Sequence, residues 1–427
     1  MNPGAPEFEI IRDPLWDNIR LDRLTMAVVD TRPVQRLRYV RQLGHAFLVY
    51  PGATHTRFEH ALGAYHLARS AVQSLAERGE LGGVPEEDRT AVLLAALLHD
   101  IGHYPFSHGL EEAGFPHHER LGVERLAGED LAGPLAAWGI PRLVGRIGGL
   151  VTGETSAPLA GLISGSLDLD KIDYLSRDAF MCGVPYGTVD VDRLLASLTL
   201  VETDGRLEVG VHEKGVSALE SLLFSKYQMY RNVYWHHAVR SATCMFKRAV
   251  RDAVAGGHVD PAAIADTTDD ALMELLVSGA RSELALCLRG RRLYKRALDL
   301  PASDVPADAQ PWLADDPALT ARVEDAMARD AGLEPGELLL DFPSRSSMLG
   351  VDLPLRLRGG TVDRLTDEGR AGQLGLPRVA DELYRSARRL RVFVARPVSR
   401  NLNGVLHVVT LSAAEIERRL DDGRPLL

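Results

Sequence analysis

Cysteine is scarce in this chain of 427 residues, which has only three: Cys182, Cys244 and Cys287. They lie far apart and none belongs to a CxxC spacing, so we predict neither a disulfide framework nor a zinc finger. Free thiols of this kind are typical of a reducing compartment. We therefore expect a cytoplasmic protein.

Long apolar runs are also lacking. The apolar stretch at residues 91–98 is far shorter than the roughly 20 residues that a membrane-spanning helix needs. Residues 1–13 are acidic and lack the apolar core of a signal peptide. We expect no membrane partner and no secretion.

An excess of positive charge is lacking too, since 49 Lys and Arg face 59 Asp and Glu, for a net charge of −10. This balance argues against a general nucleic-acid binder. The chain is 45% hydrophobic and 25% charged, which is typical of a globular protein and argues against wholesale disorder. Its length suffices for one large core and a smaller appended unit.

The distribution of apolar residues predicts a mostly α fold. Pro85, followed by acidic residues 86–88, is typical of a helix start. Asp204-Gly205 between the apolar residues 198–201 and 207–211 predicts a β-hairpin. We expect a helical core over residues 1–255 and a smaller α+β portion over residues 256–427, which packs on the core and contributes to oligomer contacts.

The second portion is predicted in more detail from its periodicity. Helices are expected at residues 260–276, 315–331 and 379–389, and strands at residues 338–342, 353–357 and 390–395. The basic run at residues 289–296 is typical of a solvated helix face.

A His-Asp pair, His99-Asp100, follows directly on the apolar run. Burying an unpaired carboxylate costs several kcal/mol, so this pair needs a strong partner. A divalent metal ion accepts both a neutral imidazole and a carboxylate as ligands. His60 and Asp170, on two further predicted helices, can complete the site, although a lone helical histidine is usually a hydrogen-bonded structural residue.

Histidine is concentrated around the same turn. Seven histidines fall within residues 60–118, although histidine adds little to a core and must be hydrogen-bonded there. A polar network that caps helices is the alternative explanation. An imidazole titrates near neutral pH, so such a cluster can also transfer protons.

Several strings together resemble the HD-domain phosphohydrolases, and more narrowly their deoxynucleotide triphosphohydrolase branch. The main strings are HTRFEH at 55–60, HDIGHYPFSH at 99–108 and DLDKIDYLSRD at 168–178. Supporting strings lie at residues 30–38, 42–44, 50–53 and 230–236. The resemblance covers about residues 8 to 300 and implies an HD-domain helical core.

The resemblance implies that a metal-activated water attacks the α-phosphorus of a deoxynucleoside triphosphate, releasing deoxynucleoside and triphosphate. The implied metal ligands are His60, His99, Asp100 and Asp170. The implied proton-transfer residues are His103, His108, Glu111 and His118, the last chosen over His117 because His118-Glu119 matches the family. Mn, Fe, Mg, Zn and Ni all suit such a donor set.

The resemblance also implies a substrate site. Its residues are Gln42, Leu43, Arg57, Lys171, Tyr174, Asp178, Tyr234 and His236. Arg57 and Lys171 would neutralise the triphosphate, unless they form ordinary surface ion pairs. Asp178 would accept the 3′-hydroxyl, and close packing would exclude a 2′-hydroxyl. For Tyr234 and His236, plain helix packing is the alternative.

Vertebrate members of the family suggest a second nucleotide site, for an activating GTP or dNTP between the subunits of a dimer or tetramer. The matching residues are Asp30, Gln35, Arg38, Arg291 and Lys295. The chain departs from the family at residues 12–18, where relatives carry Asn for Arg12 and a His-Gly after the Asp-Pro step. This departure bears on activation and not on the catalytic centre.

Two other functions remain open. One is a different HD-domain hydrolase, either a nucleotide phosphatase or a cyclic-nucleotide phosphodiesterase, which would release different products. The other is a non-catalytic regulatory or nucleic-acid-binding HD protein. The set of ligand and proton-transfer residues and the acidic net charge argue against this second alternative.

Overall fold

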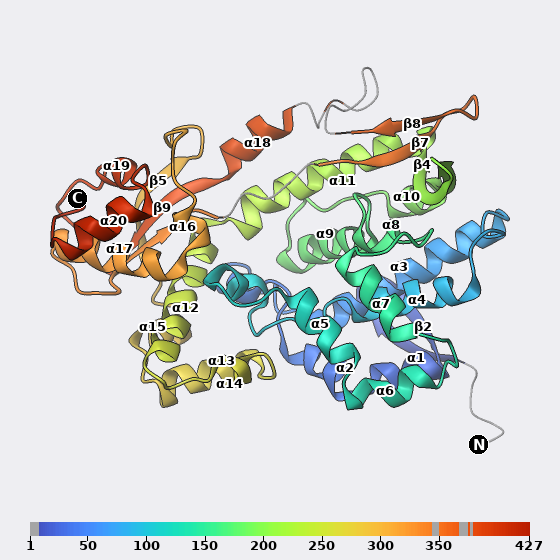
Figure 1. Cartoon of the computed structure of the whole chain (residues 1–427), viewed down its shortest axis with the longest axis horizontal. Helices are drawn as coiled ribbons and strands as arrows, with labels where there is room; N and C mark the ends of the chain where they lie inside the picture. The colour runs from blue at the N-terminus through green and yellow to red at the C-terminus, as the bar shows by residue number, and fades with distance from the viewer. Residues whose placement is uncertain (1–7, 344–349, 367–374, 376–378) are drawn as a thin grey trace.

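The computed structural model describes residues 8–343, 350–366, 375 and 379–427. It confirms the predicted fold class: a large helical core with small sheets, and an α+β portion toward the C-terminus. In Figure 1 the blue to green helices form the core, and α16 (Trp312–Asp315), α17 (Pro317–Asp330), α19 (Val405–Val408) and α20 (Ala413–Asp421) gather at the opposite end, whereas the orange strands β7 (Leu353–Arg356) and β8 (Val362–Leu365) lie beside the core. The long helix α12 (His237–Ala255) leads from one region toward the other.

Three helices position the candidate site. They are α3 (Arg57–Glu77), α4 (Glu86–Leu98) and α9 (Leu169–Cys182), and α3 packs against both of the others. Thr56 and Glu59 form a capping box at the start of α3, which satisfies its first free N–H groups. As predicted, α4 starts with an acidic turn after Pro85, and it ends at Leu98 with His99 as its C-cap.

Further helices surround these three. Next to α9 and α4 lie α11 (Val216–Met229) and α7 (Leu143–Thr152). The others of the core are α1 (Arg23–Val29), α2 (Arg32–Arg36), α5 (His118–Leu126), α6 (Glu129–Ala136), α8 (Gly161–Ser164) and α10 (Val191–Ser197). Their apolar faces build one large buried cluster, of which Leu67, Leu94 and Ile172 are examples.

The predicted hairpin is confirmed. Strands β3 (Leu198–Thr203) and β4 (Arg206–His212) are antiparallel, and Asp204 and Gly205 between them have φ of 53° and 74°. Positive φ at both positions is what a tight type I′ turn requires. A second hairpin, β1 (Phe8–Asp13) with β2 (Asp17–Asp22), was not predicted.

The β3–β4 hairpin is extended by strands from much later in the chain. Strand β7 (Leu353–Arg356) pairs in parallel with β4, and β8 (Val362–Leu365) pairs antiparallel with β7. Leu353, Leu355 and Leu365 belong to the same buried cluster as the helical core. The predicted second portion therefore shares a sheet with the first.

A separate three-stranded sheet builds the C-terminal region. Its order is β5 (Lys295–Pro301), β9 (Arg389–Val394), β6 (Leu338–Asp341), all antiparallel. The accompanying helices are α16 (Trp312–Asp315), α17 (Pro317–Asp330), α18 (Ala380–Ala387), α19 (Val405–Val408) and α20 (Ala413–Asp421). The strands and helices predicted from residue 315 onward are confirmed.

Two predictions in this part of the chain are wrong. The helix expected at residues 260–276 is broken into α13 (Pro261–Ile264) and α14 (Asp269–Glu274), because the Thr268 side chain accepts a hydrogen bond from Ala271 N–H and starts a new helix. The basic run is no helix face: α15 (Glu283–Arg289) ends in it and β5 begins at Lys295. Arg291, with φ 54°, turns the chain between them.

Within the described residues, every helix is too short or too polar to cross a lipid bilayer.

Candidate metal centre and catalytic cleft

A cavity of about 1020 Å³ holds most of the predicted site residues. Its lining comes from the helical core, from α12 and from α17 and β6 of the C-terminal region. The residues predicted as metal ligands or proton-transfer groups that line it are His99, Asp100, Asp170, His103, His108, Glu111 and His118.

The predicted metal ligands converge on one point. His60 Nε2 lies 2.8 Å from Asp170 Oδ1 and 3.3 Å from His99 Nε2. Asp100 Oδ1 and Oδ2 lie 3.4 Å from His99 Nε2 and 3.6 Å from His60 Nε2. Four donor groups from α3, the end of α4 and α9 thus face one another, although they are far apart in sequence.

Neighbouring acceptors fix the orientation of both imidazoles. His60 Nδ1 lies 2.7 Å from Asp173 Oδ2, and His99 Nδ1 lies 2.9 Å from the carbonyl oxygen of Ala96. A ring nitrogen that donates its proton in this way leaves the other nitrogen free as a ligand. The two Nε2 atoms lie 3.3 Å apart, and a divalent cation would replace the proton that is otherwise held between the two rings and the nearby carboxylates.

The charges around this point also favour a cation. Burial disfavours the charged form of His60, but the carboxylates of Asp170 and Asp173 outweigh it and raise the pKa of His60 to about 10. Burial likewise opposes ionisation of Asp100, yet Arg57 and its histidine neighbours hold the pKa of that carboxyl well below its usual range. The negative charge of these carboxylates, which favours the protonated form of His60, also attracts a metal ion.

Arg57, predicted as a triphosphate contact, is buried and paired within the protein. One of its terminal nitrogens lies 2.6 Å from Asp100 Oδ2, and its Nε donates to Ser107 Oγ at 3.0 Å. The guanidinium lines the cavity. The contacts of Arg57 in the structure hold Asp100 in place. A contact between Arg57 and the substrate stays a prediction.

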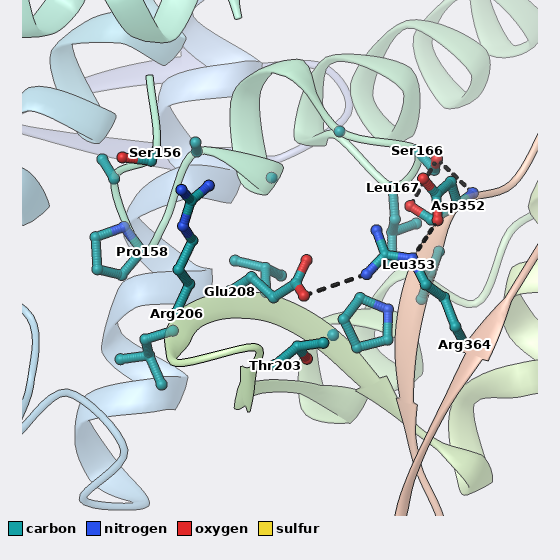
Figure 2. A pocket seen from close by; sticks show the side chains of 18 of the residues that line it. Ser156, Pro158, Ser166, Leu167, Thr203, Arg206, Glu208, Asp352, Leu353 and Arg364 are labelled. Carbon is teal, nitrogen blue, oxygen red and sulfur yellow. Dashed lines mark hydrogen bonds and ion pairs between the residues drawn. The ribbon is translucent and has the colours of Figure 1, made fainter. Parts of the chain in front are cut away.

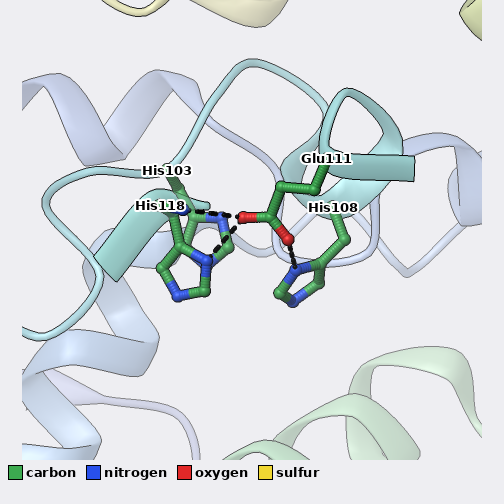
Figure 3. A group of neighbouring side chains, drawn as sticks. All are labelled: His103, His108, Glu111 and His118. Carbon is green, nitrogen blue, oxygen red and sulfur yellow. Dashed lines mark hydrogen bonds and ion pairs between the residues drawn. The ribbon is translucent and has the colours of Figure 1, made fainter. Parts of the chain in front are cut away.

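A second cluster surrounds the carboxylate of Glu111 (Figure 3). Oε1 lies 2.6 Å from His118 Nδ1 and accepts the His118 backbone N–H at 3.0 Å, whereas Oε2 lies 2.9 Å from His108 Nδ1. The ring of His103 stacks on that of His118, with centroids 3.7 Å apart. Together, these four residues offer donor atoms within 4.8 Å of one another.

Charge in the second cluster is concentrated on Glu111. Burial opposes its ionisation, but hydrogen bonds from His108 and His118 move the pKa of Glu111 far below its usual range. His103 behaves differently, because burial and then Arg57 lower its pKa well below the usual value, which keeps the ring neutral. His103 Nε2 lies 3.1 Å from Asp100 Oδ1, so Asp100 links the two clusters.

The residues predicted around the sugar share one carboxylate, that of Asp178. Tyr234 donates its hydroxyl to Asp178 Oδ2 at 2.7 Å, and His55 Nε2 lies 2.7 Å from Oδ1. His55 stands in the HTRFEH string but was not predicted as a site residue. Gln42 lines the cavity, and its Oε1 is buried without a hydrogen-bond partner among the described residues. Leu43 and Tyr174 line it as well.

The triphosphate side of the cavity holds the predicted Lys171 and a second lysine that was not predicted. Lys171 Nζ donates to Asp168 Oδ2 at 2.5 Å and to the Gly165 carbonyl at 3.0 Å, so its charge is already paired. Lys226, on α11, lines the same cavity. Burial and then the charge of Lys171 lower the pKa of Lys226 to about 8. Nothing in the sequence pattern marked Lys226, a lone lysine within a helix, as a site residue.

His236 does not line the cavity. Its Nδ1 accepts the backbone N–H of Ala238 at 3.3 Å and so caps α12, and its ring lies edge-on to Tyr50. The structure therefore brings Tyr234 to the cleft and leaves His236 outside it.

The residues predicted for an activator fall into two groups. Gln35 accepts a hydrogen bond from Arg38 at 2.8 Å, close to Asp30 at the end of α1. Arg291 donates to the carbonyl of Leu48, and Lys295 starts β5. Among the described residues, none of these hydrogen bonds joins the two groups.

A further ion-pair network, which the sequence did not predict, ties the cleft to the C-terminal region. Arg240 of α12 donates hydrogen bonds to both carboxylate oxygens of Glu112, at 2.8 and 2.7 Å, and it forms an ion pair with Asp341 of β6 at 2.7 Å. Lys247 adds a contact with Glu112 at 3.1 Å.

A second cavity, of about 630 Å³, lies between the loop that precedes α9 and the β3–β4 and β7–β8 strands (Figure 2). Arg364 bridges Glu208 at 3.2 Å and Asp352 at 2.5 Å there. None of the predicted site residues is among those that line it.

Comparison with known proteins assigns the family. Residues 57–178 match the HD domain, and residues 189–368 match the HD associated region. The chain is similar to the uncharacterized protein MJ1154 of Methanocaldococcus jannaschii, with 37% identity over 292 residues, 68% of this chain and 60% of that one. It is also similar to the uncharacterized protein YwfO of Bacillus subtilis, with 34% identity over 59% of this chain and 57% of the relative.

A third relative carries an activity in its name. Deoxynucleoside triphosphate triphosphohydrolase SAMHD1 of Homo sapiens is 30% identical over 263 residues, 54% of this chain and 42% of that protein. The chain thus spans less than two thirds of the length of each of these relatives. An HD domain implies a divalent metal, which the donor set described above fits. The chain belongs to the HD-domain phosphohydrolase family.

Proposed function

We propose that the protein is a metal-dependent triphosphohydrolase that cleaves deoxynucleoside triphosphates to deoxynucleoside and inorganic triphosphate. One observation carries the proposal: Asp100 joins a set of metal donors to a Glu111-centred histidine cluster in one cavity. Phosphoester hydrolysis needs both an electrophile for the phosphate oxygens and groups that move protons. The printed name of SAMHD1 adds the substrate class.

The candidate ligands His60, His99, Asp100 and Asp170 would hold a divalent ion, which lowers the pKa of a bound water and stabilises charge on phosphate oxygens. Arg57 keeps Asp100 ionised, and Asp173 keeps His60 Nε2 free to bind. Mn, Fe, Mg, Zn and Ni all remain candidates for the ion.

Proton transfer is assigned to the second cluster. The half-exposed His108 reaches into the cavity, and its Nδ1 is held by Glu111, so its Nε2 is the nitrogen available to a leaving oxygen. His118 is oriented by the same carboxylate. The neutral His103 lies between them and Asp100 and completes the wall of the cavity.

Recognition of the sugar is assigned to the other side of the cavity. Asp178, held by Tyr234 and His55, offers the carboxylate for a 3′-hydroxyl, and the unpaired Oε1 of Gln42 offers a further acceptor. Hydrogen-bonding sites reject substrates that lack the matching group far better than apolar pockets do. Lys226 and Lys171 both line the cavity and are assigned to the triphosphate, Lys171 while it stays paired with Asp168.

Purified protein tests this function directly. Bound metal is measured by mass spectrometry, and each dNTP is incubated alone and with GTP or a second dNTP, which also tests nucleotide activation. Chromatography should show deoxynucleoside and inorganic triphosphate. Orthophosphate or a nucleoside monophosphate as the only product would contradict the proposal and favour another HD-domain hydrolase.

The assembly is part of the proposal. We infer a homo-oligomer, dimer or tetramer, in which the C-terminal portion from residue 256 contributes contacts and the Gln35–Arg38 pair lies near an activating nucleotide. Support comes from the exposed position of that pair and from the similarity to SAMHD1. Light scattering with and without GTP tests the assembly independently of hydrolysis.

A further inference from the structure

The turn that carries His108 has an unfavourable backbone conformation. Phe106 and Ser107 are consecutive non-glycine residues with φ of 58° and 61°. The left-handed region costs an L-residue about 1–2 kcal/mol. Such a conformation persists only where neighbouring contacts impose it, so the contacts of this turn identify what positions His108.

One buried carboxylate provides those contacts. Asp269, the first residue of α14, has a relative exposure of 1%. Its Oδ1 accepts the backbone N–H of Phe106 at 2.7 Å, and its Oδ2 accepts the backbone N–H of Arg41 at 3.0 Å. Arg41 immediately precedes Gln42 of the cavity wall. A single side chain therefore joins α14 to both the histidine turn and the Gln42 segment.

The next residue of the turn continues the connection to the metal centre. Ser107 Oγ donates to the carbonyl of Arg41 at 2.7 Å and accepts from Arg57 Nε at 3.0 Å. Arg57 in turn contacts Asp100 Oδ2 at 2.6 Å. A shift of the turn away from Arg41 would thus disturb the support of Asp100 as well as the position of His108.

Two arginines reinforce the same junction from outside. Arg36 donates to the carbonyls of His103 and Thr267, and Arg125 donates to the carbonyls of Ile101 and Ala265. Both bridge the histidine turn to the chain just before Asp269. The segment at residues 265–269 is therefore bonded to the turn at several points, and Asp269 is the side chain that accepts a backbone N–H of the turn directly.

We propose that Asp269 is a positioning residue: its carboxylate holds the turn at residues 106–108 and the segment at residues 41–42 together, and thereby sets His108 and Gln42 at the cavity. Asp269 does not itself line the cavity. The effect on hydrolysis rests on the function proposed above, whereas the effect on the turn does not.

The carboxylate form matters because only that form accepts two strong hydrogen bonds. The charged groups facing Asp269 are Arg41, paired at 3.2 Å, Arg36 on α2 and the neighbouring Asp270. Burial raises the pKa of Asp269 to about 6, against the opposing effect of Phe106 N–H and Arg41. Asp269 is therefore ionised at neutral pH and becomes protonated as the pH falls below about 6.

Stability alone does not explain this aspartate. Its folded pKa of about 6 lies above the ordinary value of 3.8, so its contribution to stability is full below the ordinary pKa and is lost as the pH rises through about 6. At neutral pH the ionised group therefore costs folding free energy, and its benefit lies in the geometry of the turn.

Amide hydrogen exchange of the resting protein tests the proposal without substrate. The variant is Asp269→Asn, and Asp270→Asn is the matched control, because Asp270 is the adjacent carboxylate with a side-chain exposure of 92%. Asp269→Asn should speed exchange about tenfold in peptides covering residues 39–44 and 101–110 and leave α3 unchanged, since one acceptor is lost. Asp270→Asn should leave all of these peptides as in the wild type.

Wild-type protein compared at about pH 5.5 and about pH 7.5, after correction for intrinsic exchange rates, provides the second measurement if the variant fails to fold. Because the pKa of Asp269 in the closed turn lies above its ordinary value, protonation favours the closed turn over an open one, so exchange in the same two peptides should be slower at about pH 5.5 than at about pH 7.5. Unchanged exchange in the variant, or loosening spread evenly over the chain, would overturn the proposal.

Activity provides a third measurement. Asp269→Asn should lower kcat about tenfold with bound metal retained, and its activity should fall less steeply below about pH 6 than that of the wild type. A variant with wild-type kcat and an unaltered acid limb would also overturn the positioning role. If the wild type hydrolyses no dNTP, the proposed function fails, while the exchange measurement still decides whether Asp269 holds the turn.

Discussion

The two histidine clusters that meet at Asp100 differ in how their rings are held. In the first, His60 and His99 each bond a separate acceptor, Asp173 and the Ala96 carbonyl, from their own surroundings. In the second, His108 and His118 share a single carboxylate, Glu111. The side chain of His60 is fully buried, whereas that of His108 is 56% exposed.

This difference matches two chemical tasks. A metal ligand must keep one nitrogen aimed at a fixed point, and independent buried acceptors achieve that. A proton-transfer group must exchange protons with solvent and substrate, so partial exposure and a shared anion suit it. Changes in the first cluster should therefore alter metal content, and changes in the second should alter kcat at constant metal content.

The largest effect is expected where the clusters meet. Asp100→Asn removes the charge that faces both His99 and His103, and it leaves Arg57 with an uncompensated buried charge. Bound metal should be lost, and hydrolysis should fall by more than about a thousandfold because the activation of water is lost with the ion. Mass spectrometry of the metal and dNTP hydrolysis are the measurements, with circular dichroism as the folding control.

Retention of metal by Asp100→Asn with wild-type activity would remove Asp100 from both clusters. The comparison between the clusters would then have no shared residue, and the proposed function would lose its main support.

The next effect separates the clusters. Glu111→Gln removes the anion that orients His108 and His118 but leaves the ligand set unchanged. We expect kcat to fall about 10- to 100-fold with full metal content, the usual cost of losing an orienting partner. Glu119→Gln is the control, because Glu119 also faces His118, at 3.5 Å, but is 44% exposed. Loss of metal in Glu111→Gln would show instead that the second cluster holds an ion.

The sequence predicts the first cluster better than its surroundings for a physical reason. His99 and Asp100 are adjacent and follow an apolar helix, so their burial and their need for a cation are visible without the fold. The supporting residues are single side chains brought in from distant segments. Asp269 and Lys226 have no periodic or motif signal of their own. His55 lies in the HTRFEH string, but only the packing of the helices shows that it contacts Asp178.

The same contrast applies to the fold. The β3–β4 hairpin was predicted because Asp204-Gly205 determines its turn locally. The pairing of β4 with β7 joins Val211 to Leu355, and no local pattern encodes such a distant register. The break before α14 was missed since helical periodicity continues across Thr268, where a capping side chain starts the second helix.

A smaller effect is expected at the triphosphate side. Lys226→Gln removes an ammonium group that lines the cavity and is not itself a member of either histidine cluster. We expect KM to rise about 3- to 10-fold with kcat nearly unchanged, as for binding made equally in ground and transition states. Lys214→Gln, at an exposed lysine, is the control. An equal fall in kcat and kcat/KM would assign Lys226 to the transition state.

The smallest effect is expected at His236, which the family resemblance places at the substrate and the structure places at the start of α12. His236→Ala removes the cap, so the free energy of unfolding should fall by about 1 kcal/mol. Since the ring does not line the cavity, kcat and KM should stay within about twofold of the wild type. Denaturant unfolding and steady-state kinetics on one sample separate the two effects. A rise in KM beyond tenfold at unchanged stability would mean that the cleft rearranges when substrate binds and takes His236 into it.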